Sequence, residues 1–296
     1  VADDVTVVRA GETVAEVKSK DVTARQLAEL MVGSELPQPT THGDTRRSEV
    51  TLELKDVSIP TATGSRDLIS HISFNLHAGE VVGIAGVEGN GQAELVEAIM
   101  GLRNYTGSID FQGSSIDHMS VAHRHDLGIG LIPEDRQRQA LMMDSPLWEN
   151  RILGHQRGKP VMRGFILDRK ATIEDTKRIM EEFDVRAPGP MTAAAALSGG
   201  NQQKFIVGRE MSKAPALLVA SHPTRGVDVG AQGAIWEVLR EARTKGMAIV
   251  LISADLEELI GMSDRLLVML RGVITAELDP QKTTPEQLGS AMTGAA

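Results

Sequence analysis

The feature that most constrains the fold of this chain is a glycine-rich turn that directly follows a short apolar run. The run is Val81–Ala85, and Gly86, Gly89 and Gly91 follow it before a helix-like segment, Leu95–Met100. A continuous apolar run of this length suits a strand that is buried on both faces of a parallel sheet. In a turn between such a strand and a helix, the backbone N–H groups can surround a phosphate group.

The rest of the chain repeats this alternation of strands and helices. Ala216–Ala220 and Ala248–Ile252 are further continuous apolar runs, whereas Thr51–Val57 and Ile72–Leu76 alternate apolar with polar residues, as half-buried strands do. Apolar stripes at helical spacing comprise Ile235, Val238, Leu239 and Ala242, and also Ile173, Thr176, Met180 and Phe183. These patterns predict an α/β fold with a parallel core sheet and a mostly helical insertion at about residues 135–211.

Charge and composition exclude several classes of function. The formal net charge is -9, whereas a general nucleic-acid surface needs an excess of basic groups, so we expect no nucleic-acid partner. The chain has no cysteine, which excludes a disulfide scaffold, a cysteine nucleophile and cysteine-ligated metals. This composition is compatible with a reducing cytoplasm. No apolar run approaches the roughly 18 residues of a membrane-spanning helix.

An internal repeat predicts how the chain is divided. Asp3–Gly11 resembles Asp264–Gly272, and Thr23–Gly33 resembles Thr284–Gly294 with the same offset. We therefore expect residues 1–33 to be the tail of a preceding homologous domain. Residues 34–48 carry two prolines and mostly polar side chains, which predicts a linker. Residues 49–296 would then form a second domain.

Two residues of the glycine-rich turn depart from a complete phosphate-binding loop. That loop reads Gly, four residues, Gly, Lys and then Ser or Thr, whereas Gln92 and Ala93 occupy the last two positions here. Losing a hydrogen bond to a charged group costs about 1.5–3 kcal/mol, so the change weakens triphosphate binding. Taken alone, the turn is also compatible with a connection that binds nothing. The candidate nucleotide-binding residues are Gly86, Glu88, Gly89, Asn90, Gly91, Gln92, Ala93 and Glu94.

A second motif opens a helix further along the chain. It reads LSGGNQQK at Leu197–Lys204, and here the chain resembles the ABC ATPases, whose signature motif is LSGG. Ser221–Ala231 (SHPTRGVDVGA) resembles the end of the Walker B strand and the D-loop of sugar and nucleoside importers in this family. The resemblance covers residues 50–296. It implies a P-loop nucleotide-binding domain with a parallel core sheet, an antiparallel β subdomain and a helical subdomain.

The same resemblance implies that several catalytic groups are missing. Family members carry an aspartate that helps to hold magnesium and a glutamate that activates water, where this chain has Ser221 and His222. The switch histidine is replaced by Ala254, and the Q-loop glutamine by Glu134. We expect the chain's own site to hold no metal and to bind nucleotide weakly or without turnover. His222 is expected to be a structural replacement.

The signature, by contrast, is intact. In the family, two such domains pair head to tail, and the signature of each faces the ATP that the other holds. The resemblance implies that Ser198, Gly199 and Gly200 act in trans, with Asp228 of the D-loop setting the geometry across the interface. ATP and Mg²⁺ would then be bound mainly by the preceding nucleotide-binding domain of the same protein.

The resemblance also implies membrane partners. These are two permease subunits and, indirectly, an extracytoplasmic substrate-binding protein, so the chain would lie peripherally on the cytoplasmic face of the membrane. We expect docking around Arg136–Leu153. Trp148 suits a core position equally well, but its place in the family pattern favours an interface beside the Q-loop. Phe183–Arg186 and the missing carboxylates are most similar to the nucleoside importers, with simple sugars as the other substrate class. The alternatives are a non-transport ABC protein and a regulatory domain that does not hydrolyse nucleotide.

Overall fold

The computed structural model describes residues 2–9, 11–33, 39, 43, 45–61 and 67–295. Its core sheet has the strand order β14-β13-β5-β12-β11-β8, and only the β13–β14 pair is antiparallel. The strands are β5 (Val81–Ala85), β8 (Ile129–Ile132), β11 (Leu217–Ser221), β12 (Ala248–Ile252), β13 (Arg265–Leu270) and β14 (Val273–Leu278). All residues of β5, β11 and β12 are buried, as expected for strands covered on both faces.

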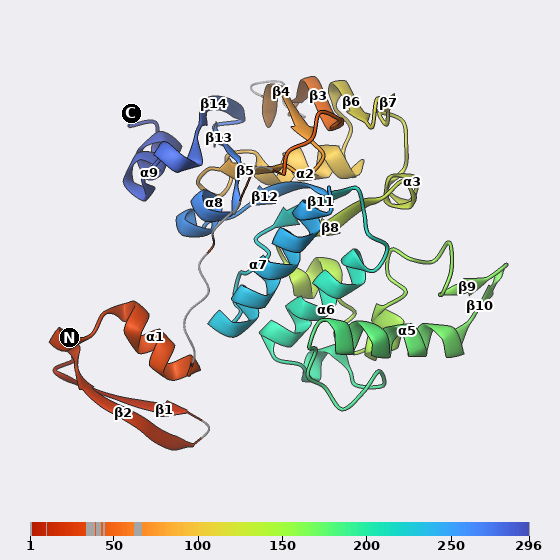
Figure 1. Cartoon of the computed structure of the whole chain (residues 1–296). Helices are drawn as coiled ribbons and strands as arrows, with labels where there is room; N and C mark the ends of the chain where they lie inside the picture. Colours follow the sequence, from red (N-terminus) through yellow and green to blue (C-terminus); the bar gives the residue numbers. More distant parts are fainter. Residues whose placement is uncertain are drawn as a thin grey trace.

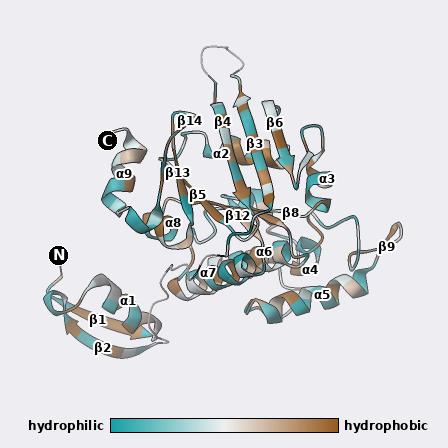
Figure 2. Ribbon diagram, turned by 45° about the horizontal axis from the view of Figure 1, so that its top comes forward, coloured by the Kyte–Doolittle hydropathy of each residue, from teal (hydrophilic) through white to brown (hydrophobic). Residues whose placement is uncertain are grey.

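A second, antiparallel sheet packs against the core through helix α2 (Gln92–Met100). Its strand order is β4-β3-β6-β7, and its strands are β3 (Val50–Ile59), β4 (Ile69–His77), β6 (Thr106–Phe111) and β7 (Ser114–Ser115). Leu95 and Ile99 of α2 share one apolar cluster with Leu52 of β3 and Val82 of β5. The apolar colouring in Figure 2 follows these strands, which fits the alternation that predicted β3 and β4.

A second apolar cluster joins the core sheet to helices. They are α6 (Gly199–Met211), α7 (Val229–Thr244), α8 (Leu256–Met262) and α9 (Pro285–Thr293), and Figure 1 shows α6 and α7 running side by side. Ile235, Leu239 and Ala242 of the predicted stripe on α7 are buried in this cluster, and Val238 packs against it. The period of the stripe therefore identified the buried face of α7 correctly.

The segment predicted as a helical insertion contains several short elements before α6. They are the π-helical turn η2 (Arg136–Ala140), α4 (Leu147–Asn150), the hairpin β9 (Met162–Arg163) and β10 (Ile166–Leu167), α5 (Arg169–Glu182) and the 3-10 turn η3 (Ala194–Ala196). The buried residues of α5 are Thr172, Thr176, Ile179 and Met180. The predicted stripe was thus right at Thr176 and Met180, and Phe183, which caps the end of the helix, packs against the same cluster, whereas Ile173 is only half-buried.

Trp148 does not lie at a docking surface in this chain. It is 9% exposed, and the guanidinium carbon of Arg169 lies 5.0 Å from the centre of its ring. Leu147 and Asn150 beside it are also buried, so this turn belongs to the interior of the helical region. The sequence expectation for Trp148 is therefore corrected: the side chain packs inside the chain instead of facing outward.

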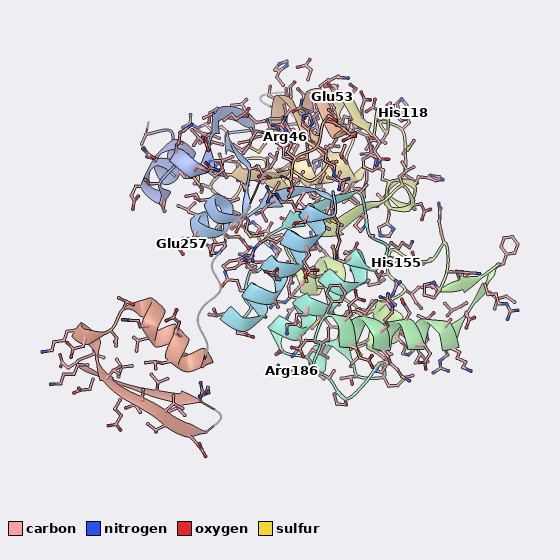
Figure 3. All side chains as sticks on the ribbon, in the orientation of Figure 1. Arg46, Glu53, His118, His155, Arg186 and Glu257 are labelled. Carbon is pink, nitrogen blue, oxygen red and sulfur yellow. The ribbon has the colours of Figure 1, made fainter. Side chains whose placement is uncertain are left out.

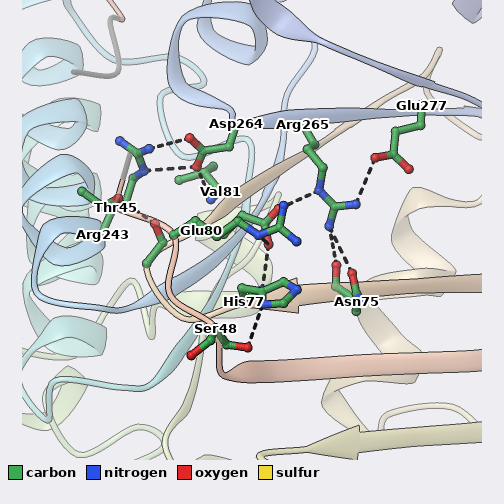
Figure 4. A network of polar contacts seen from close by, with 12 residues as sticks. Thr45, Ser48, Asn75, His77, Glu80, Val81, Arg243, Asp264, Arg265 and Glu277 are labelled. Atoms are coloured by element: carbon green, nitrogen blue, oxygen red, sulfur yellow. Dashed lines mark hydrogen bonds and ion pairs between the residues drawn. The ribbon is translucent and has the colours of Figure 1, made fainter. Parts of the chain in front are cut away.

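A buried carboxylate, Glu80, holds the turn before β5 against β13. It is fully buried, and it accepts hydrogen bonds from the backbone N–H of His77 at 2.8 Å and from Nε of Arg265 at 2.6 Å. Next to it, Asp264 accepts from the backbone N–H of Val81 at 2.8 Å, and Figure 4 shows both carboxylates in one network. These charge-assisted bonds fix the start of the strand that leads into the glycine-rich turn.

The two ends of the chain have the same local structure. The elements β1 (Asp4–Arg9), β2 (Glu12–Lys18), η1 (Ser19–Asp21) and α1 (Ala24–Val32) correspond one to one to β13, β14, η4 (Pro280–Lys282) and α9. Both hairpins have a register shift at the equivalent step, Val7/Val8 and Val268/Met269. Both helices begin with a Thr–Gln capping box and end on a glycine with a positive φ. The sequence repeat is therefore also a structural repeat.

Two further segments complete the description. Helix α3 (Val121–Asp126) precedes β8. Most of the predicted linker, residues 34–48, lies outside the described residues, although Thr45 donates to the carbonyl oxygen of Gly79 at 2.7 Å. None of the helices in the described ranges is long and apolar enough to cross a bilayer.

Candidate nucleotide and signature sites

Four loops emerge at the same edge of the core sheet. The strands β5, β8, β11 and β12 are parallel, so the segments that follow them all leave from the carboxyl ends of the strands. These segments contain Gly86, Glu134, His222 and Ala254, respectively. The fold therefore brings the glycine-rich turn into one region with the three loops in which the sequence departs from the ABC ATPase pattern.

The glycine-rich turn is occupied by one of its own side chains. Gln92 begins α2 and is 8% exposed. Its Nε2 donates to the carbonyl oxygen of Val87 at 3.2 Å, and its Oε1 accepts from the backbone N–H of Asn90 at 3.1 Å. In a phosphate-binding turn, such backbone N–H groups point at the anion. Here the side chain of Gln92, at the lysine position of a complete loop, accepts a hydrogen bond from one of these N–H groups.

Other contacts hold the turn in place without a ligand. The Oδ1 of Asn90 accepts from the backbone N–H of Arg271 at 2.7 Å. Gly91 has a φ of 110°, and a Cβ atom at this position would lie 2.7 Å from Cγ2 of Ile69, so only glycine fits. Ala93, which is exposed, offers no hydroxyl group, and Glu94 adds a negative charge. These contacts fix the conformation of the turn, and Gln92 and Ala93 stand where a complete phosphate-binding loop carries Lys and Ser or Thr.

A cleft of about 500 Å³ lies beside the turn. Its lining residues are Glu88, Glu134, Asp135, Arg136, Gln137, Arg225 and Gly226. Three of these are carboxylates and two are guanidinium groups, so the lining has no excess of positive charge. Arg225 already donates to Oε1 of Glu134 at 2.6 Å. The carboxylates of the cleft thus offset its guanidinium groups, whereas a triphosphate is normally bound by an excess of cationic groups or by a metal ion.

His222 takes part in the backbone structure of the site. Its Nδ1 accepts a hydrogen bond from the backbone N–H of Ala254 at 3.2 Å, and its own N–H donates to the carbonyl oxygen of Ile252 at 2.7 Å. Burial lowers the pKa of its imidazole, so the ring is neutral near pH 7. The Nδ1 lone pair is therefore already engaged. This geometry supports a structural role for His222 over that of a general base.

The signature motif has a different environment. Ser198 is the exposed N-cap of the 13-residue helix α6, and its Oγ accepts from Nδ2 of Asn201 at 3.0 Å. The N–H groups of Gly199 and Gly200 lie in the first turn of the helix and have no acceptor within it. A hydroxyl hydrogen, free amides and the positive end of a helix dipole together suit contact with an anion from outside the chain.

Gly200 and Asp228 are in direct contact. Asp228 caps α7 by accepting from the backbone N–H of Ala231 at 3.0 Å. A Cβ atom at Gly200 would lie 2.9 Å from Oδ2 of Asp228, so this position has no room for a side chain. The structure thus places all four predicted trans-acting residues, Ser198, Gly199, Gly200 and Asp228, where the first turns of α6 and α7 meet.

Arg136 is a positioning residue that the sequence patterns did not identify. Its guanidinium donates to the carbonyl oxygens of Arg225 at 2.7 Å and Gly226 at 3.3 Å, and to Oε1 of Gln202 on α6 at 3.3 Å. It therefore joins the Q-loop segment, the D-loop segment and the signature helix. The sequence offers one signal for Arg136, which is its place directly after the Glu134–Asp135 pair. Its planar guanidinium can donate to several carbonyl oxygens at once.

The chain matches a family model and many characterised relatives. The model described as "ABC transporter" matches residues 69–225. The guanosine import ATP-binding protein NupO of Bacillus subtilis is 39% identical, and the alignment covers 99% of this chain and 58% of NupO. The nucleoside import ATP-binding protein NupA of Lactococcus lactis is 40% identical, and the ribose import ATP-binding protein RbsA of Lacticaseibacillus paracasei 35%, with 58% and 57% of each covered. The chain thus spans somewhat more than half of these relatives.

Solved structures agree on the fold. A nucleotide-free ATP-binding cassette from an ABC transporter superposes with a TM-score of 0.67 at 21% identity, covering 82% of this chain and 95% of that one. A dimeric post-hydrolysis cassette bound to ADP and Pi also gives a TM-score of 0.67, at 20% identity, with 78% of this chain and 100% of that one covered. The predicted fold class is thereby confirmed, and the chain belongs to the ABC transporter family as one of its ATP-binding cassettes.

Proposed function

We propose that this chain is the second cassette of a two-cassette ATP-binding subunit of an ABC importer for nucleosides or simple sugars. In this proposal its signature residues complete the ATP site of the preceding cassette, while its own site binds nucleotide weakly or without turnover. The observation that carries the proposal is the contrast between the two half-sites. Ser198 presents an exposed helix N-terminus, whereas Gln92 fills its own glycine-rich turn.

The action of the chain's own residues follows from this contrast. Closure of the two cassettes would bring Ser198 and the amides of Gly199 and Gly200 against the terminal phosphate of ATP held by the partner. Donors aimed at developing negative charge are the largest source of catalytic stabilisation in such sites. Asp228 and Arg136 would hold the signature at the required position. ATP and Mg²⁺ would be bound by the first cassette, and the chain's own residues do not fit a magnesium triphosphate.

The structural repeat supports the position of the chain in a longer protein. Residues 4–32 form the hairpin and helix that end a cassette, and β13, the counterpart of β1, pairs with β5 in the complete domain. Among the described residues, β1 pairs only with β2. An edge strand of this kind is normally covered by a neighbouring strand. In the proposal, that neighbour is the corresponding strand of the preceding domain.

The names of the relatives support import of nucleosides or sugars, and therefore permease subunits, a substrate-binding protein and a location at the cytoplasmic face of the membrane. Because Trp148 is buried, permease contact would fall on the exposed residues near it. These are Gln137, Arg138, Gln139, Met142 and Asp144. The competing functions, a non-transport ABC protein and a non-hydrolysing regulatory domain, predict no co-purification with two integral-membrane subunits.

The direct test is to assay ATP hydrolysis by this chain alone, by the first cassette alone and by the two together. We expect the mixture to hydrolyse ATP at least tenfold faster than either part, and this chain to bind a fluorescent ATP analogue at least tenfold more weakly than the first cassette. Hydrolysis by this chain alone at the rate of the mixture would contradict the proposal. Stimulation of the reconstituted transporter by a nucleoside or a pentose would then identify the substrate class.

A further inference from the structure

Two histidines and a glutamate meet inside the chain, far from the glycine-rich turn and the signature. His125 lies near the end of α3, His155 in the loop after α4, and Glu210 in the last turn of α6. One ligand atom from each lies within 4.8 Å of the other two. The two rings meet edge to face with their centres 4.8 Å apart, and Nε2 of His125 is 3.6 Å from Oε2 of Glu210. No motif in the sequence predicted this cluster.

His155 is the residue of this cluster that most needs an explanation. It is 1% exposed, and neither of its ring nitrogens has a hydrogen-bond partner within the described ranges. The Nδ1 of His125 has no partner there either. A buried polar group without a partner costs about 1–3 kcal/mol, and such groups are rare in native proteins. A ligand that accepts the lone pair of His155 would remove this cost.

Glu210 turns one of its carboxylate oxygens toward the two histidines. Arg209 donates to Oε1 of Glu210 at 2.9 Å, so Oε2 faces the histidines, with the backbone N–H of Leu131 3.4 Å away. Arg151 is neutralised by Asp175, with Nε and Oδ2 2.6 Å apart. Asp175 also pairs with Arg178, and Lys213 adds positive charge near His155, so Glu210 is the carboxylate that would offset the charge of a bound ion. Each imidazole has a ring nitrogen whose lone pair can bind a metal ion.

We propose that His125, His155 and Glu210 bind a divalent transition-metal ion, with Zn²⁺ as the best match. Two imidazoles and one carboxylate suit zinc, whereas Mg²⁺ and Ca²⁺ prefer sets of oxygen ligands. Zinc bonds are about 2.0–2.2 Å long, so the ligand atoms must approach one another by roughly 1 Å. The side chain of His125, which is 13% exposed, is placed to make this movement and to admit the ion. The fourth position would hold water.

The ion would join three separate elements. Helices α3 and α6 both pack on β8, and the loop after α4 carries His155. Figure 3 labels His155 near α6, between the helical region and the core, and His118 on the opposite side of α3. A metal held by all three elements would fix the carboxyl end of the signature helix relative to β8. The inference does not depend on the transported substrate or on the state of the nucleotide site.

Calorimetric titration of the EDTA-treated chain with Zn²⁺ tests the site. We expect one ion per chain, a melting temperature raised by several degrees, and visible absorption bands typical of tetrahedral coordination when Co²⁺ is used instead. His155→Gln and His125→Gln should each weaken binding at least tenfold; the second variant changes the less deeply buried histidine, whose side chain is 13% exposed, and keeps the fold testable. His118→Gln, at an exposed histidine, is the matched control and should bind as the parent does.

Two results would overturn the proposal. One is that the folded parent chain takes up no Zn²⁺ or Co²⁺. The other is that His155→Gln and His125→Gln bind Zn²⁺ as tightly as the parent while His118→Gln loses binding, which would place the ion on surface histidines.

Discussion

The Nδ1 of His222 accepts a hydrogen bond from the backbone N–H of Ala254 at 3.2 Å. In an active cassette, these two positions carry the glutamate that activates water and the switch histidine. In this chain, the residues at these two positions bind each other. The loops after β11 and β12 are thus held together by this contact, which engages the Nδ1 lone pair of His222.

His222→Ala should therefore affect stability but not turnover. We expect the free energy of unfolding to fall by about 1 kcal/mol, because one hydrogen bond is lost. ATP hydrolysis by the two-cassette protein should remain within twofold of the parent. His222 has a φ of 49°, so His222→Gly, which loses the same bond but relieves this strain, should be more stable than His222→Ala by about 1 kcal/mol. Urea unfolding measures both, and a large loss of turnover would show that His222 is catalytic.

Arg136→Ala should separate the signature helix from the D-loop segment. Three hydrogen bonds from the guanidinium would be lost, and we expect a loss of about 2 kcal/mol in stability and at least a tenfold loss of turnover. Arg136→Lys should not restore turnover, since an ammonium group cannot span the three acceptors. The control, assayed like Arg136→Ala without permease subunits, is Arg138→Ala, because that side chain is 87% exposed and pairs with Asp135 at a distance of 3.7 Å. Equal effects of the two alanine variants would rule out the positioning role.

Gly200→Ala should disturb the contact between the signature and Asp228. The added methyl group would lie 2.9 Å from Oδ2 of Asp228 and 3.1 Å from Cβ of Ala231, so one helix must move. We expect a lower melting temperature and at least a tenfold loss of turnover. Gly158→Ala adds the same group where no heavy atom lies within 4 Å, and should change neither quantity. Normal turnover of Gly200→Ala would mean that this close approach has no functional importance.

Glu258→Gln should change how stability depends on pH. Oε1 of Glu258 accepts from Oγ1 of Thr224 at 2.8 Å and Nε1 of Trp236 at 2.7 Å, and burial raises the pKa of this carboxyl above 4.5. A raised pKa in the folded state gives stability that is present below pH 4.5 and is lost as pH rises through the folded value. Glutamine keeps the acceptor but cannot ionise. The stability of the variant relative to the parent should therefore increase as the pH rises above 4.5 and through the raised pKa of the parent's carboxyl. A difference independent of pH would contradict this explanation.

The sequence identified most of the fold because the strongest patterns depend on burial alone. Val81–Ala85 and Ala248–Ile252 are the central strands β5 and β12, and the third run begins only one residue later than predicted. The stripe on α5 was less accurate, since Phe183 packs against the core from a position beyond the end of the helix. Trp148 was misplaced because its chemistry suits an interface and an interior equally well.

The details of the site depend on contacts of the folded chain that sequence patterns do not reveal. The replacement at Gln92 was visible in the sequence, but its bonds to Asn90 and Val87 depend on the conformation of the turn. Arg136 donates to the backbone carbonyls of residues about 90 positions away in the chain. Every residue type has such a carbonyl, so the sequence does not reveal these contacts. The cluster of His125, His155 and Glu210 likewise requires three elements to meet in space.

The division of roles between the signature and the glycine-rich turn is tested most directly by ATP hydrolysis in the two-cassette protein. Ser198→Ala removes the exposed hydroxyl group that would face the partner's site in the proposal, and Gln92→Ala removes the side chain that fills the chain's own turn. Both variants should first be shown to be folded by circular dichroism. We predict at least a tenfold loss of turnover for Ser198→Ala and a change of less than twofold for Gln92→Ala. The opposite order, with Gln92→Ala inactive and Ser198→Ala normal, would contradict the proposed function.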